Sequence, residues 1–134
     1  MNLEFVARLI VALYDTIILN RSGGELLCHA VWSIAYLMDH AAVDGERIDL
    51  LLAQPGLVTS IVALLKSDSI RALTGALRTV GNIITGTDEQ TTTILDFGVK
   101  INAEMIEINN FLKTWSFYTN LNINVNFKTF WTYC

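Results

Sequence analysis

Two pairs of side chains have the capacity to bind a ligand: Trp32 with Tyr36, and Arg78 with Asn82. The members of each pair are four residues apart, and this spacing places both on one face of an α-helix. Aromatic rings attract cations with roughly 0.5–2 kcal/mol, and an asparagine amide both donates and accepts hydrogen bonds. The four residues therefore carry chemistry suited to binding, and none of it requires a covalent step.

Each of these side chains also has a structural interpretation that needs no ligand. Trp32 could be an ordinary buried aromatic residue, and Tyr36 could fill the core or lie on the surface. Arg78 could be a solvated charge on a helix, the commonest situation for an arginine. Asn82 could use its amide to bond a neighbouring carbonyl. The choice depends on the elements that carry these four residues.

The sequence offers little for catalysis or metal binding. Cys28, His29 and Asp39 have the residue types of a nucleophile set, but they span three helical turns and no oxyanion motif accompanies them. The sequence contains no CxxC, HExxH, Walker or GxGxxG motif. We therefore expect a protein that is not an enzyme and that uses no metal or other cofactor.

The composition narrows the class of protein further. Of the 134 residues, 52% are hydrophobic and 16% are charged, which excludes disorder for most of the chain. The net charge of −4 argues against nucleic acid as a partner. The most apolar stretch, 3–19, is interrupted by Arg8 and Asp15, so no membrane span is expected. The composition is that of a soluble, intracellular protein, and its two cysteines suggest a reducing compartment.

Apolar periodicity predicts a series of helices over the first hundred residues. One apolar stripe consists of Leu57, Ile61, Leu64 and Leu65, and a second consists of Leu73, Leu77, Val80 and Ile84. The residues at 67–69 are expected to end the first of these helices and to cap the helix that carries the second stripe. The expected helices cover 28–37, 47–53, 56–65, a segment from the break at 67–69 to the break at 85–88, and 91–95.

The order of long helix, break, short helix and glycine occurs twice. Gly56 and Gly98 are 42 residues apart, and Tyr36 and Asn82 are 46 residues apart. Periods in this range, with two or three helices in each unit, are typical of armadillo and HEAT repeats. Each unit leaves an apolar face that only a stacked neighbour can cover. The stretch 3–19 would be the end of a preceding unit.

Two motifs resemble the importin-alpha family. The run AVWSIAYLMD at 30–39 is similar to the WALSYLTD stretch of that family, and ALRTVGNIITGTDEQT at 76–91 is similar to its ALRAVGNIVTGTDEQT segment. The resemblance covers about 3–99 and the middle repeats of the family. It implies an all-α armadillo-repeat superhelical solenoid that acts as a nuclear import adaptor, located in the cytoplasm and the nucleus. Its partners would be basic nuclear localisation signal peptides of cargo proteins.

The chain also departs from the family pattern. The basic segment through which the family binds importin-beta is absent from the 134 residues, so we expect no recruitment of importin-beta by this chain alone. Gly75 replaces a proline that is usual at its position in the family. The loops at 15–24 and 40–45 are longer than is typical of the family.

The resemblance implies a peptide-binding site on the concave face of the stack. In the family, tryptophans form slots for Lys and Arg side chains, and asparagines hold the peptide backbone. The Tyr36 and Arg78 substitutions are those of the middle repeats, which hold the linker of a bipartite signal. Asn82 is expected to be accessible to solvent, without a fixed intramolecular partner. The implied peptide-binding residues are Trp32, Tyr36, Asp39, Arg78, Asn82 and Asp88.

Asp39 and Asp88 have a second interpretation, because both follow a long helix. Acidic residues at such breaks often cap helices, and the resemblance implies that they also attract basic cargo. Residues 1–98 carry 6 basic and 11 acidic side chains. An alternative function is that of a scaffold of the beta-catenin type, but such a groove would be basic and would hold acidic partners. The charge of the concave face therefore distinguishes the two functions.

Composition changes near residue 100, which predicts two parts: armadillo repeats over 1–99 and a divergent tail over 100–134. Residues 101–134 contain seven of the ten asparagines and eight of the thirteen aromatic residues. Within this tail, 101–112 has the apolar spacing of a helix and 121–128 alternates like a strand. We interpret the tail as an extension that does not belong to the family.

Overall fold

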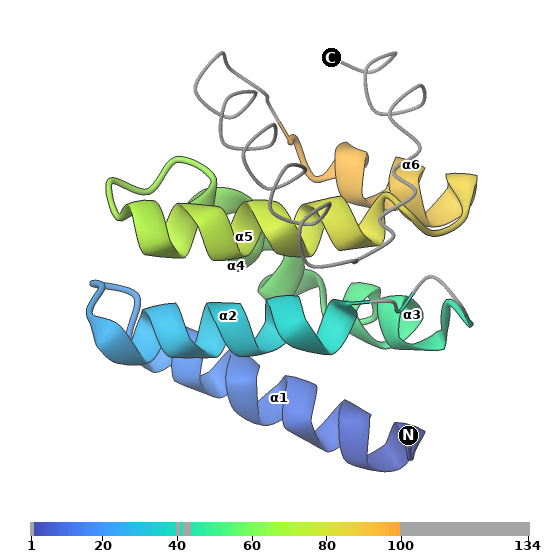
Figure 1. Ribbon diagram of the computed structural model, residues 1–134, viewed down its shortest axis with the longest axis horizontal. Coiled ribbons are helices and arrows are strands. Elements are labelled where there is room, and N and C mark those ends of the chain that lie inside the picture. The colour runs from blue at the N-terminus through green and yellow to red at the C-terminus, as the bar shows by residue number, and fades with distance from the viewer. Residues whose placement is uncertain (1, 40, 42–43, 100–134) are drawn as a thin grey trace, which may run out of the picture.

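The structure is a computed structural model that describes residues 2–39, 41 and 44–99. Within these ranges every regular element is an α-helix (Figure 1). The helices are α1 (Leu3–Leu19), α2 (Glu25–Met38), α3 (Glu46–Leu52), α4 (Pro55–Leu64), α5 (Ile70–Ile83) and α6 (Asp88–Asp96). The predicted all-α fold is confirmed for the described residues.

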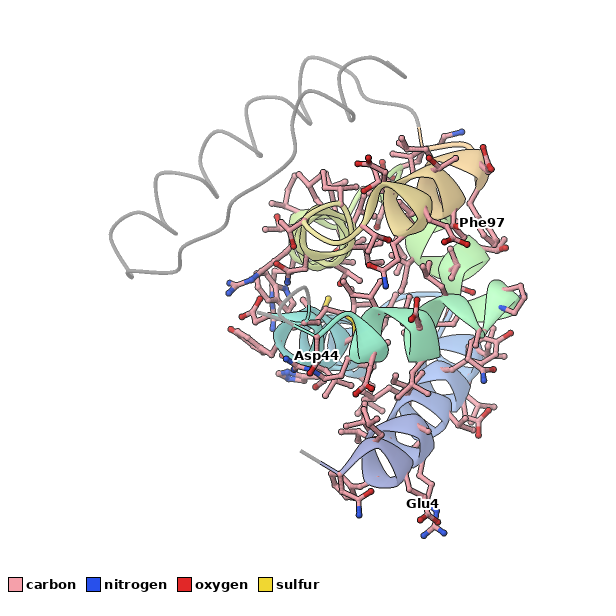
Figure 2. The ribbon with its side chains drawn as sticks, turned by 90° about the vertical axis from the view of Figure 1, so that its right-hand side faces the viewer. Glu4, Asp44 and Phe97 are labelled. Atoms are coloured by element: carbon pink, nitrogen blue, oxygen red, sulfur yellow. The ribbon has the colours of Figure 1, made fainter. Side chains whose placement is uncertain are left out.

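The helices form two stacked units with the same internal order. In each unit a long helix, α2 or α5, is followed by a short one, α3 or α6. Figure 1 shows α2 and α5 lying side by side along nearly the same direction, and these two helices form the most extensive contact in the fold. Figure 2 shows α2 and α5 on one side of the stack, with α3 and α4 on the other. This arrangement is the armadillo type of solenoid that the sequence predicts.

Side-chain caps explain where several helices begin. Asn2 caps α1 by accepting from the backbone amide of Glu4 at 2.9 Å, and Ser69 caps α5 by accepting from that of Ala72 at 3.3 Å. At α6, Thr87 and Gln90 form a reciprocal capping box. This capping box starts α6 at Asp88, three residues before the predicted start.

Gly24 and Gly86 are required as glycines for different structural reasons. Gly24 has φ +98°, a conformation that favours glycine, and the turn it forms lets α2 begin at Glu25 rather than at the predicted residue 28. Gly86 follows α5, as predicted, but its backbone is not among the left-handed glycines of the described chain. A side chain at position 86 would instead collide with Oε1 of Gln90. Gly86 is therefore needed for close packing against Gln90 of the same unit and Ile48 of the other unit.

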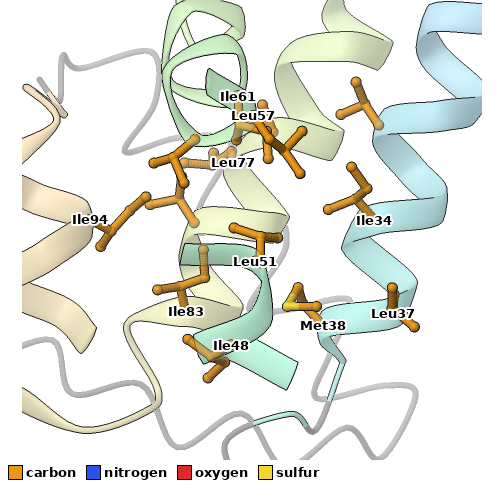
Figure 3. Packing of buried hydrophobic residues seen from close by; sticks show 14 of the residues in the cluster. Ile34, Leu37, Met38, Ile48, Leu51, Leu57, Ile61, Leu77, Ile83 and Ile94 are labelled. Atoms are coloured by element: carbon orange, nitrogen blue, oxygen red, sulfur yellow. The ribbon is translucent and has the colours of Figure 1, made fainter. Parts of the chain in front are cut away.

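The core runs continuously through both units. Ile48 and Leu51 of α3 lie between Met38 of α2 and Ile83 of α5 (Figure 3), and all four are fully buried. Burial of such a side chain stabilises a fold by roughly 1.5–3 kcal/mol. The predicted stripe Leu73, Leu77, Val80 and Ile84 is buried, and in the other stripe only Leu64 stays partly exposed. One hydrophobic cluster therefore extends through both units.

Some expectations fall outside the described part of the chain. The predicted helix over 101–112 and the strand over 121–128 both lie there, and the division at residue 99 stays a prediction. Among the described residues, no single helix is long and apolar enough to cross a membrane. Only the pair α3 and α4 together, which meet at 89°, has such a length and composition.

Candidate functional site

The face formed by α2 and α5 brings five of the six predicted site residues together. Trp32 and Tyr36 lie one turn apart on α2, with their ring centroids separated by 5.7 Å. The guanidinium carbon of Arg78, on α5, lies 5.8 Å from the Trp32 ring centroid and 5.2 Å from that of Tyr36. The positively charged guanidinium of Arg78 therefore already occupies the space beside the two aromatic rings.

Asp39 holds Arg78 in this position. Nη2 of Arg78 donates to Oδ2 of Asp39 at 2.7 Å, and Nε donates to Oδ1 at 3.2 Å. The Arg78 side chain is only 5% exposed and the Asp39 side chain 18%. A guanidinium at this depth requires a charged partner, and the two-bond geometry provides one with a defined orientation.

The position of Asp39 is itself fixed by the end of α2. Asp39 directly follows Met38, the last residue of that helix. Arg47 of α3 donates to the carbonyl oxygens of Leu37 at 2.6 Å and of Asp39 at 3.3 Å. A cation that bonds the last carbonyls of a helix stabilises its C-terminal end. Three helices therefore contribute to the placement of one carboxylate.

Asn82 joins the same carboxylate, and this corrects one expectation from the sequence. Its Nδ2 donates to Oδ1 of Asp39 at 2.7 Å and to the carbonyl oxygen of Ala35 at 3.1 Å. The residue is 4% exposed. The prediction that Asn82 is accessible and lacks a fixed intramolecular partner is wrong. The reason is that α5 packs closely along α2, which places the amide over the C-terminal turn of α2.

Trp32 is not the fully buried aromatic residue that was considered for it, whereas Tyr36 does lie on the surface. Tyr36 is 57% exposed, and Trp32 is partly exposed. The Trp32 indole is fixed in place because Nε1 donates to the carbonyl oxygen of Arg71 at 2.9 Å. The exposed ring of Tyr36 is thus the part of the cluster that a ligand can reach most easily.

Gly75 contributes to the site in a way that the sequence did not reveal. A Cβ at position 75 would lie 3.0 Å from Cγ1 of Val31 and 3.2 Å from Cδ1 of Trp32. These distances are tighter than ordinary contact, so glycine allows α5 to lie against the indole. The replacement of the family's proline was visible in the sequence, but its proximity to Trp32 depends on how the two helices pack.

Asp88 lies apart from the cluster. It is the first residue of α6, it is exposed, and Thr87 is the capping residue of that helix. Its carboxylate lies in the first turn, where a negative charge interacts favourably with the helix dipole. Its predicted contact with a peptide stays a prediction. Cys28 is buried, and the described residues contain no group of His, Cys and acidic side chains arranged to hold a metal ion.

Comparison with known proteins agrees with the motifs. No family profile matches the chain. Over 72 residues, 54% of the chain, it is 39% identical to importin subunit alpha-3 of Arabidopsis thaliana. Over 79 residues, 59% of the chain, it is 37% identical to importin subunit alpha-1a of Oryza sativa subsp. japonica. These matches span only 13% and 14% of the two relatives. This chain is therefore importin-alpha-like.

Proposed function

We propose that this chain acts in nuclear import and that its α2–α5 face binds part of a nuclear localisation signal. The observation that carries the proposal is the joint placement of Trp32, Tyr36 and Arg78 on that face. Similarity to importin alpha subunits supports the functional class. The chain would then act in the cytoplasm and the nucleus, and importin-beta would be a partner of full-length members of the family.

The geometry favours a surface that holds the linker of a bipartite signal over a site that binds a lysine side chain tightly. A lysine of the signal would have to compete with Arg78, which already lies near both rings. The bidentate pair with Asp39 also neutralises Arg78, so this surface presents little net charge from the pair. A peptide would therefore rest on the exposed ring of Tyr36 and make few charged contacts here.

Asn82 takes a positioning role in this proposal. Both hydrogen bonds from its Nδ2 go to atoms of α2 or the residue after it. Its amide therefore orients Asp39, and Asp39 in turn holds Arg78 against the rings. The backbone of a bound peptide would find its partners elsewhere on the face.

A titration with a labelled bipartite signal peptide tests the proposal. We expect binding in the high micromolar to millimolar range, because one stretch of a repeat array provides few of the contacts that together give high affinity. Tyr36→Ala should weaken this binding about threefold, since it removes the most accessible ring of the face. Phe5→Ala is the matched control, because Phe5 is equally exposed but lies on α1. Equal binding by the two variants would contradict the assignment of the face.

The alternative, a scaffold of the beta-catenin type, receives no support from the described residues. It requires a basic groove, whereas Arg78, whose guanidinium lies over the aromatic pair, is neutralised by Asp39. Titration with an acidic peptide in parallel distinguishes the two functions directly.

A further inference from the structure

A cavity of about 500 Å³ lies away from the α2–α5 face. It is formed by the end of α1, the start of α2 and the second half of α4, with Ser67 after α4. Figure 1 shows that the α1–α2 turn and the α4–α5 turn lie at the same end of the molecule. The volume falls within the range of sites that hold small molecules, roughly 300–1,000 Å³.

The inner surface of the cavity is apolar. Ile17 of α1 and Leu27 of α2 are buried beneath it, and Ala63 and Leu64 of α4 line one wall. The hydroxyl of Ser60, also in the wall, already donates to the carbonyl oxygen of Gly56 at 2.9 Å. The walls therefore favour a hydrocarbon group over a polar one.

Two polar side chains of the lining can donate hydrogen bonds to a ligand, and one of them, Arg21, is positively charged. Arg21 lies in the turn after α1, is exposed, and forms no ion pair with any described residue. The hydroxyl oxygen of Ser67 accepts from the amide of Ser69 at 3.1 Å, which leaves its hydrogen available. No acidic side chain lines the cavity. A positive group beside an apolar space complements a ligand with a negative head and an apolar body.

We propose that this cavity binds a small amphipathic anion, a carboxylate attached to a hydrocarbon chain or ring. Its carboxylate would accept hydrogen bonds from Arg21 and Ser67, and its hydrocarbon part would lie against Ala63 and Leu64, above the buried Ile17 and Leu27. The site is separate from the face proposed to bind signal peptides, so either proposal can fail without the other.

Three ten-carbon probes test the charge preference of the site in the full chain: decanoate, decanol and decyltrimethylammonium, each titrated below its micellar concentration. Decanoate should bind most tightly. Arg21→Gln should weaken decanoate binding about threefold, as expected for one exposed ion pair, and should leave decanol unchanged. Arg8→Gln is the control, because Arg8 is an exposed arginine near the other end of α1. Equal binding of all three probes would overturn the proposal.

A second variant tests the location of the site. Ala63→Phe fills the cavity from an exposed position on α4 and should reduce decanoate binding at least tenfold. Ala12→Phe makes the same change at an exposed alanine of α1 outside the lining. Thermal unfolding of both variants verifies that each is folded. Undiminished decanoate binding by folded Ala63→Phe, or equal loss in Ala12→Phe, would show that the anion does not occupy this cavity.

Discussion

Arg78 and Asp39 are 39 residues apart in the chain, yet they form a bidentate ion pair between α5 and the end of α2. The pair joins the two units of the stack at the candidate site. It also fixes the guanidinium beside Trp32 and Tyr36. The same contact therefore supports the fold and determines what the binding face presents to a peptide.

Removal of the carboxylate should destabilise the stack. Asp39→Ala would leave a guanidinium that is 5% exposed without this partner, and loss of one member of a buried pair costs about 3–5 kcal/mol. Because Asp39 is 18% exposed, we expect a smaller loss, about 2–3 kcal/mol in urea unfolding. Asp15→Ala, at an exposed position on α1, should change stability by less than about 0.5 kcal/mol. Similar losses for the two variants would contradict the role of the pair.

Asn82→Ala should reduce the free energy of unfolding by about 1–3 kcal/mol, because it removes two donated hydrogen bonds, one of them a buried bond to the carbonyl oxygen of Ala35. Gln54→Ala serves as the control, since Gln54 has no helix-capping side-chain bond at the start of α4. Chemical denaturation of both variants tests this prediction. A loss below about 0.5 kcal/mol for Asn82→Ala would indicate that Asn82 is accessible to solvent, as expected from the sequence.

Two glycines of the same helix provide an internal comparison. Gly75→Ala places a Cβ about 3.0 Å from Val31, which is fully buried, so we expect a net loss of about 1 kcal/mol from overpacking. Gly81→Ala meets nothing within 4 Å and should gain about 0.5–1 kcal/mol from the better helix propensity of alanine. Melting temperatures that shift in opposite directions would agree with the packing of α5 against Trp32; equal gains would contradict it.

Gln90 connects the second unit to the first. Its Nε2 donates to the carbonyl oxygen of Gly45 at 3.0 Å and to Oδ1 of Asp49 at 2.8 Å, while its Oε1 accepts from the amide of Thr87. Gln90→Ala should therefore cost about 1–3 kcal/mol in thermal or chemical unfolding. Glu89→Ala, at an exposed neighbouring position of α6, should have little effect. An unchanged free energy of unfolding for Gln90→Ala would show that these hydrogen bonds do not stabilise the stack.

The sequence predicts helices well where the apolar pattern is long and regular. It places the cap of α5 within 67–69, and the structure assigns this cap to Ser69. The loop expected over 15–24 is wrong in its first part, because α1 continues to Leu19. The helix starts at Glu25 and Asp88 differ from the predictions because a glycine turn and a capping box determine them. The spacing of apolar residues does not predict such turns and caps, so it locates helix starts poorly.

The site was predictable only in part, for a physical reason. Spacing places Arg78 and Asn82 on one face of α5, but it cannot show that both bond a carboxylate on the neighbouring unit. Asn82 was expected to be accessible because the family resemblance implied a position on a peptide-binding face. Its burial arises from the packing of two helices whose hydrogen-bonded residues are 39 to 47 positions apart.

Chemical-shift mapping tests most directly whether the α2–α5 face binds a signal peptide. A bipartite signal peptide would be added to the isotopically labelled chain up to millimolar concentration. We expect shifts concentrated at the Trp32 indole and the backbone around Tyr36, with the resonances of α3 and α4 unchanged. Shifts confined to other helices, or no shifts at millimolar peptide, would show that the peptide does not bind this face.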